Sequence, residues 1–111
     1  MNWILLTSET QLQQLITDSA ERAQVIFKHS TRCAISSMAK SRLERNFQPA
    51  GIDFYLLDLL AHRPLSLKIA DIFNVPHESP QVLLIKKGRC YYDESHSGIR
   101  MEEILEKSAE V

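Results

Sequence analysis

The chain has 111 residues, of which 13 are basic and 14 acidic, and 44% of its residues are hydrophobic. A chain of this length is expected to form a single domain over residues 1–111 that buries about two-thirds of its surface without disulfides. The formal net charge of −1 argues against a nucleic-acid binder. Apolar runs are strand-sized, so we expect neither nucleic acid nor a membrane as partner.

The N-terminal residues 1–7 have neither a basic start nor a small-residue cleavage site, so we expect no targeting signal. Two cysteines, Cys33 and Cys90, lie far apart in the sequence. Without a secretory signal, a disulfide framework is improbable, and we expect a reducing cytoplasmic location. Each thiol therefore needs its own explanation.

The first half of the chain alternates helical and strand patterns. Ser8 to Gln11 predicts a capping box, and Leu12, Leu15 and Ile16 follow at helical spacing. Residues 23–28 are rich in β-branched and apolar side chains and predict a buried strand. A helix is expected from Cys33, closed by Pro49 and Gly51. Its expected buried stripe is Ile35, Met38, Ala39, Leu43 and Phe47.

In the second half, residues 52–60 predict another strand, and a helix is expected from Pro64 to Asn74. Residues 75–80 form a stiff connector before a third core strand at 81–86. Lys87-Gly88 predicts a hairpin turn, and a last helix should start near Ser97-Gly98. Strands alternating with helices predict an α/β fold in three layers, a central mixed sheet of four to five strands flanked by helices.

Cys33 stands where a strand gives way to a helix. Free backbone N–H groups and the positive end of the helix dipole favour an anion there, and Arg32 adds a full positive charge. Ser36 lies three residues on, so its hydroxyl could donate a hydrogen bond to a Cys33 thiolate. These conditions favour a nucleophilic thiol. The alternative is a small, inert residue that fills space at a helix start.

Pro80 follows a polar residue and directly precedes a predicted core strand. A trans proline is the default at such a position, because only about 5–6% of X–Pro bonds are cis. A cis bond before Pro80 is therefore expected only on grounds of family resemblance.

Residues 27–36, Phe-Lys-His-Ser-Thr-Arg-Cys-Ala-Ile-Ser, resemble the signature of the monothiol bacilliredoxins, which are thioredoxin-like proteins of the bacillithiol system often labelled general stress proteins. His77-Glu78-Ser79-Pro80-Gln81 and Ser95-His96-Ser97-Gly98-Ile99 are similar to later blocks of that family. The resemblance extends over nearly the whole chain and implies a thioredoxin-like fold.

This resemblance implies a thiol–disulfide oxidoreductase that removes a low-molecular-weight thiol, bacillithiol or an analogue, from S-thiolated client proteins. Cys33 would attack the small thiol's sulfur and become the mixed disulfide, with Ser36 in the place of a resolving cysteine. Arg32, Cys33 and Ser36 are the expected catalytic residues. No tightly bound cofactor and no metal is implied, and the small thiol is a co-substrate.

The resemblance also assigns the expected substrate-binding residues. Pro80 corresponds to the fold's cis-proline, and the preceding Ser79 would offer backbone groups to the client. Ser97 and Gly98, at the expected start of the last helix, would receive a carboxylate of the small thiol. Many thioredoxins keep a buried acid six residues before the active cysteine, whereas this chain has Phe27. His29 and His77 are the remaining nearby candidates for proton handling, and His77 is also placed among the substrate-binding residues.

Three alternatives stay open at this stage. His29, Cys33 and His77 could meet at a metal, although one cysteine is weak evidence for structural zinc. A shared iron–sulfur cluster is disfavoured because Ala34 and Ile35 stand where cluster-binding relatives carry glycine and phenylalanine. The fold could also serve a non-catalytic redox sensor or binding module. We interpret Cys90 as a packing residue or bystander. A role as a distal resolving thiol is the less favoured alternative.

Overall fold

The computed structural model describes residues 1–110, in which strands and helices alternate. The strands are β1 (Ile4–Leu5), β2 (Ala23–His29), β3 (Ile52–Asp58), β4 (Gln81–Lys86) and β5 (Arg89–Ser95). The helices are α1 (Glu9–Asp18), α2 (Ala34–Glu44), α3 (Arg63–Phe73), a short 3₁₀ turn η1 (His96–Gly98) and α4 (Met101–Ala109).

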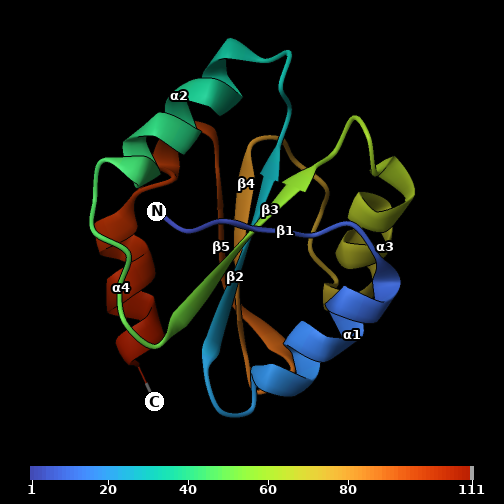
Figure 1. The fold of residues 1–111 in the computed structure, drawn as a ribbon, viewed down its shortest axis with the longest axis vertical. Helices are drawn as coiled ribbons and strands as arrows, with labels where there is room; N and C mark the ends of the chain where they lie inside the picture. The colour runs from blue at the N-terminus through green and yellow to red at the C-terminus, as the bar shows by residue number, and fades with distance from the viewer. Residues whose placement is uncertain (111) are drawn as a thin grey trace.

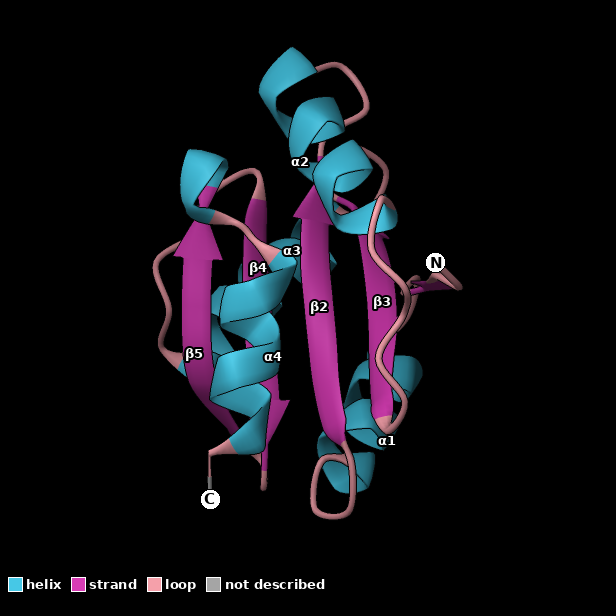
Figure 2. Ribbon diagram, turned by 90° about the vertical axis from the view of Figure 1, so that its left-hand side faces the viewer, coloured by secondary structure: helices cyan, strands magenta, loops and turns pink. Residues whose placement is uncertain are grey.

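Within the described residues the five strands form one mixed sheet in the order β1-β3-β2-β4-β5. β2 and β1 both run parallel to β3, while β4 runs antiparallel to β2 and to β5. Helices α1 and α3 cover one face, and α2 and α4 cover the other (Figure 1 and Figure 2). This arrangement confirms the expected three-layer α/β fold.

Strand β2 is central and separates two apolar cores. Ile26 faces a cluster built from α1 and α3, whereas Val25 and Phe27 face a cluster built from α2 and α4. A strand covered on both faces reads as a continuous apolar run rather than an alternating one, which explains the apolar residues 25–27. The polar residues that continue this strand, Lys28 and His29, are therefore buried too, on opposite faces.

Local signals place several element ends as expected. Ser8 Oγ accepts the Gln11 N–H at 3.2 Å, so this half of the capping box is confirmed. The side-chain oxygen Oε1 of Gln11 accepts the N–H of Thr7 instead of that of Ser8. α3 ends at Asn74, whose φ of 55° is the left-handed C-cap conformation. The hairpin turn has positive φ at both Lys87 (52°) and Gly88 (77°), which matches the strand twist.

The buried face of α2 differs from the expected stripe. Its buried residues are Ser36, Ala39 and Leu43, whereas Met38 is 63% exposed. The helix also ends at Glu44, and Phe47 beyond it is 97% exposed. Several apolar side chains at helical spacing, Ile35 among them, therefore face solvent, because the side of α2 that packs on the sheet carries small residues and a serine.

The last helix begins later than expected. α4 starts at Met101 with Arg100 as its N-cap, and residues 96–98 form the separate turn η1. Met101 and Ile104 are buried as expected, while Leu105 is 40% exposed. The prediction that Ser97-Gly98 opens the last helix is wrong, because the chain passes through an extended Ile99 before α4 begins.

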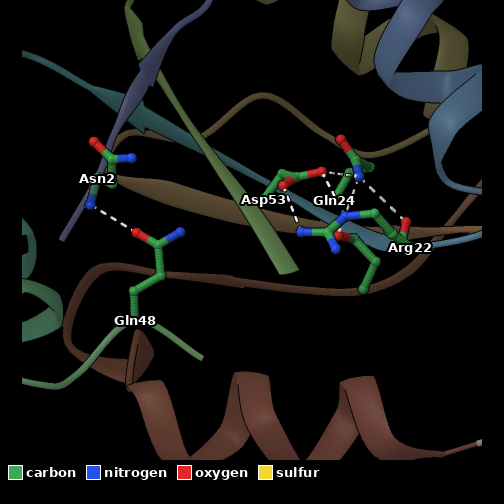
Figure 3. A network of polar contacts seen from close by, with 6 residues as sticks. Asn2, Arg22, Gln24, Gln48 and Asp53 are labelled. Carbon is green, nitrogen blue, oxygen red and sulfur yellow. Dashed lines mark hydrogen bonds and ion pairs between the residues drawn. The ribbon is translucent and has the colours of Figure 1, made fainter. Parts of the chain in front are cut away.

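The end of the sheet where β2 and β3 begin is tied by paired polar groups. Arg22 donates to both carboxylate oxygens of Asp53, at 2.8 and 3.2 Å, and Gln24 Nε2 donates to the same carboxylate at 2.7 Å. Figure 3 shows Arg22 and Gln24 turned toward Asp53, and the Asn2 backbone nitrogen turned toward Gln48. No helix among the described residues is long and apolar enough to cross a membrane.

Candidate active site

The pairing of β2 with β4 assembles the sequence-predicted residues at the opposite end of the sheet, where β2 ends. Gln81 pairs with Lys28, so Pro80 lies beside the segment that leads from β2 to Cys33. The Ser79–Pro80 peptide bond is cis, as the resemblance implied. The His96 N–H donates to the Pro80 carbonyl at 3.1 Å, which brings η1 to the same place. The carboxyl end of β2, the cis-proline loop and η1 therefore form one site.

Cys33 occupies the N-cap position of α2. Its N–H donates to the Ser30 carbonyl at 3.2 Å, and its carbonyl accepts the Ser37 N–H at 3.0 Å. The thiol is free and half-buried, and its side chain makes no capping hydrogen bond. Arg32 is exposed and forms no ion pair among residues 1–110. A reachable thiol beside the unsatisfied N–H groups of a helix start and an unpaired guanidinium is suited to nucleophilic chemistry.

Ser36 makes hydrogen bonds that sequence reasoning did not foresee. Its Oγ accepts the Ser30 N–H at 3.0 Å and lies 2.6 Å from His29 Nδ1. These contacts, rather than a bond to the Cys33 sulfur, hold the fully buried hydroxyl. Burial lowers the pKa of His29, with Lys40 adding to the effect, which favours a neutral imidazole that stacks on Phe27 at 5.7 Å. The pair thus fastens the end of β2 to the start of α2.

His77 and Lys28 form a second polar pair, on the α3 side of the sheet. Lys28 Nζ donates to the Ser66 carbonyl at 3.0 Å and lies 3.3 Å from His77 Nδ1. Burial lowers the pKa of Lys28 to about 8. Burial and then the charges of Lys28 and Arg63 lower the pKa of His77. His77 is the third residue before Pro80, so this pair supports the cis-proline loop.

The cis-proline loop itself leaves acceptors without partners. Gln81 Nε2 donates to the Pro76 carbonyl at 3.0 Å and braces the loop. Ser79 Oγ and Gln81 Oε1 are covered and have no hydrogen-bond partner among the described residues. Unsatisfied buried polar atoms are uncommon in folded proteins, and two of the three found among the described residues lie at this loop, the third being Gln24 Oε1 on β2.

The η1 turn is held against α2 by Arg42, which donates to the carbonyls of His96 (3.2 Å) and Ile99 (2.9 Å). Ser97 and Gly98 lie in η1 rather than in the first turn of α4, so the helix start on which their expected carboxylate site rested is not at this point, and the binding role itself stays a prediction. The Glu94 carboxyl group would stand 2.6 Å from a Cβ added to Gly98. A carboxylate already beside Gly98 disfavours a second anion at this point.

Cys90 lies at the other end of the sheet. Cys90 pairs with Ile85 on β4, and Ile85 pairs in turn with Gln24 on β2. Gln24 lies five residues before the end of β2. At about 3.3 Å per residue, β2 alone separates the two cysteines by more than 15 Å. Burial raises the pKa of Cys90 to about 11. Cys90 therefore packs as an inert side chain, and the distal resolving role finds no support.

One open groove of the described residues lies away from the thiol. A groove of about 580 Å³ opens between the beginnings of β2 and β3 and the end of β4, with Arg22, Lys86 and Glu110 among its lining residues. It is broad and open, and neither Cys33 nor Pro80 lines it. A protein client needs an accessible surface around the thiol rather than a deep pocket, so this groove is not required for chemistry at Cys33.

One overlooked site residue, Lys28, could have been found in the sequence by a stricter rule. Lys28 follows directly on an apolar run that must be buried on both faces, so a buried ammonium group was foreseeable. His29 ends that run four residues before Cys33, but its bond to Ser36 depends on how α2 docks, which no spacing reveals. Arg42 looks like an ordinary helix-surface cation and carries no signal at all.

Comparison with known proteins gives the family. The family model described as monothiol bacilliredoxin BrxC matches residues 4–104. The chain belongs to the monothiol bacilliredoxin family. Because that match spans both the Cys33 segment and the cis-proline loop, the family membership and the site geometry refer to the same part of the molecule.

Solved structures confirm the fold of this bacilliredoxin-family chain. One solved structure is described as a candidate oxidoreductase with a thioredoxin fold. It is 30% identical to this chain, with a TM-score of 0.83, and the match covers 94% of this chain and 91% of that one. Thioredoxin from Malassezia sympodialis is 18% identical, with a TM-score of 0.78 and coverage of 97% and 92%. Thioredoxin from Trypanosoma brucei brucei is 12% identical, with a TM-score of 0.75 and coverage of 96% and 87%. Family and fold together support a function of the thiol oxidoreductase type for this protein.

Proposed function

We propose that the protein removes a low-molecular-weight thiol, bacillithiol or an analogue, from S-thiolated client proteins through a mixed disulfide on Cys33. The observation that carries this proposal is the half-buried, free Cys33 thiol at the N-cap of α2, beside the cis Ser79–Pro80 bond. The family supports a thiol oxidoreductase, and the single cysteine of the Cys33–Ser36 segment supports a one-cysteine cycle.

The first step is a thiol–disulfide exchange. The Cys33 thiolate attacks the sulfur of the small thiol within the client's mixed disulfide, the old S–S bond breaks, and the client cysteine leaves as a thiolate. Cys33 then carries the small thiol in a new disulfide. Ser36 cannot resolve it, because its hydroxyl is buried and bound to His29 and Ser30.

A second molecule of the small thiol completes the cycle. Its thiolate attacks the small-thiol sulfur of the adduct, which regenerates Cys33 and releases the symmetric disulfide of the small thiol. The balance is one thiolated client plus one small thiol, giving one reduced client plus one disulfide. The reaction needs no metal and no tightly bound cofactor. It consumes a reduced small thiol, which fits a reducing cytoplasm as the proposed location.

Two features support a protein client as substrate. Ile35, Met38 and Leu60 expose apolar surface on α2 and after β3, near the end of the sheet that carries Cys33. The unpartnered Ser79 Oγ and the backbone of the cis-proline loop offer polar groups beside it. An extended client segment could therefore bind along this loop with its modified cysteine over Cys33.

The test is a turnover experiment with a client protein that carries one small-thiol adduct. The protein is added at one-twentieth of the client concentration, with the free small thiol in excess. We expect many clients to be released per molecule of protein. Release that stops after one equivalent would contradict an enzyme and favour a redox sensor that uses the same thiol.

A further inference from the structure

Lys28 is a buried cation that the proposed cycle does not use. Its side chain has no exposed surface, and it forms no ion pair within residues 1–110. Taking an ammonium group out of water without a carboxylate partner is unfavourable, and burial accordingly lowers its pKa to about 8. A strand this apolar would be more stable with a hydrophobic side chain at this position.

The contacts of Lys28 point toward the cis-proline loop. Nζ donates to the Ser66 carbonyl at 3.0 Å, which anchors it on α3, and it lies 3.3 Å from His77 Nδ1. Ser66 Oγ, on the same helix, lies 3.4 Å from the same ring nitrogen. Both groups can donate to Nδ1. Two elements of the fold therefore converge on one atom of a residue three positions before Pro80.

This geometry selects one form of the imidazole. An ammonium group has three donors and no acceptor, so Nδ1 must be the unprotonated nitrogen. A neutral ring with free Nδ1 carries its proton on Nε2. Nε2 has no hydrogen-bond partner among the described residues, and the side chain of His77 is only partly covered. The contacts of Lys28 and Ser66 with Nδ1 therefore fix the orientation of the ring and the direction in which its Nε2–H group donates.

The charges around His77 favour an anionic partner for that donor. Lys28 and Arg63 both lower the pKa of His77, and Glu78 alone opposes them. The Glu78 carboxylate lies 3.6 Å from His96 Nε2, so part of its charge faces the η1 side. A neutral imidazole N–H with two cations nearby donates a stronger hydrogen bond to a carboxylate than to a neutral acceptor.

We propose that Lys28 is a positioning residue that holds His77 as the Nε2–H tautomer, so that this N–H binds a negatively charged group of the small thiol carried by the client. The proposal rests on the proposed function and names its recognition residue. Lys28 acts through His77 and touches no reacting atom. The resemblance implied that Ser97 and Gly98 bind a carboxylate of the small thiol, and we assign that binding to His77 instead.

The tautomer is measured directly by two-bond ¹⁵N–¹H correlation of ¹⁵N-labelled protein. In the wild type, His77 should show Nδ1 unprotonated and Nε2 protonated at neutral pH. In Lys28→Met, which has a side chain of similar length and no donor, the ring should become a mixture of tautomers. Lys68→Met removes an exposed lysine from α3 and should leave His77 unchanged. A protonated Nδ1 in the wild type, or the same tautomer in Lys28→Met, overturns the proposal without any activity assay.

Kinetics tests the recognition role separately. Lys28→Met and His77→Ala should each raise the KM for the thiolated client roughly tenfold, as expected for a lost charge-assisted hydrogen bond, and change kcat little. The double variant should be no worse than His77→Ala alone, because Lys28 acts through His77. Additive losses would contradict this coupling. If the tautomer depends on Lys28 but no turnover occurs, the proposed function has failed together with the recognition role, while the positioning contact stands.

Discussion

The two ends of the central sheet treat polar groups in opposite ways. Where β2 begins, Arg22, Gln24 and Asp53 bind one another, and the Arg22 hydrogen bond lowers the pKa of the Asp53 carboxyl group. Where β2 ends, Lys28 and His29 are buried and bind only neutral partners. Arg22 is matched by the Asp53 carboxylate, whereas Lys28 has no carboxylate partner among residues 1–110.

The two cysteines follow the same division. Cys90 packs near the first end against a core cluster, and burial raises its pKa to about 11. Cys33 is half-buried at the second end, next to a helix start and a free guanidinium. The thiol at the first end is thus covered and held as a weak acid, whereas the thiol at the end proposed for chemistry stays reachable beside the cis-proline loop.

The largest expected effect separates the two thiols. Cys33→Ser should abolish release of the small thiol from a client, because a hydroxyl is not a nucleophile at neutral pH, while Cys90→Ser should keep most of the activity. The measurement is client release followed by reduction-sensitive gel shift. Activity that survives in Cys33→Ser and disappears in Cys90→Ser would reverse the assignment of the two ends.

Thiol reactivity sharpens the same contrast without any substrate. With a pKa of about 11, Cys90 has about one-thousandth of its population as thiolate at pH 8, roughly a hundredfold less than an ordinary thiol with a pKa of 9.0. Iodoacetamide should therefore modify the half-buried Cys33 first and native Cys90 much more slowly, as read by peptide mass mapping. Both should react at similar rates in denaturant. Rapid alkylation of native Cys90 would contradict its burial.

Stability against pH tests the unmatched charge of Lys28. Its pKa falls from 10.5 to about 8 on folding, so the unfolded chain binds more protons between these values and stability must rise with pH there. Relative to Lys28→Met, the wild type should gain about 2–3 kcal/mol between pH 7 and pH 10. Urea unfolding of both proteins at several pH values measures this difference. A flat or falling difference would show that Lys28 is not buried as an ammonium group.

The smallest expected effects compare single polar deletions at the two ends. Ser36→Ala leaves the Ser30 N–H and His29 Nδ1 without their partner in a buried place and should cost about 1–3 kcal/mol. Arg22→Gln breaks a partly exposed ion pair and should cost about 1 kcal/mol or less. Arg22→Gln should also leave client release unchanged. Equal losses in chemical denaturation would remove the distinction between the ends.

The sequence allowed a good part of this molecule to be predicted, and the failures have physical causes. The strand at Ala23–His29, the turn at Lys87-Gly88 and the helix end at Asn74 follow from local rules on burial and backbone conformation. The cis bond before Pro80 was expected only through resemblance, because local sequence favours trans.

What failed depended on docking between elements. The spacing of Ile35 and Met38 is helical, yet the sheet receives the face with Ser36 and Ala39 instead. The Ser36 hydroxyl was expected on the Cys33 sulfur and binds His29, because the end of β2 passes beneath α2. Lys28 was overlooked because a lysine is normally read as a surface residue.

The central claim is that Cys33 alone carries the transferred thiol, and one measurement tests it most directly. The protein is incubated with a thiolated client without free small thiol, quenched in acid, and examined by intact mass spectrometry with peptide mapping. The account predicts a single small-thiol adduct on the peptide that contains Cys33 and an equal amount of reduced client. An adduct on Cys90, or a reduced client with no adduct on the protein, would contradict it.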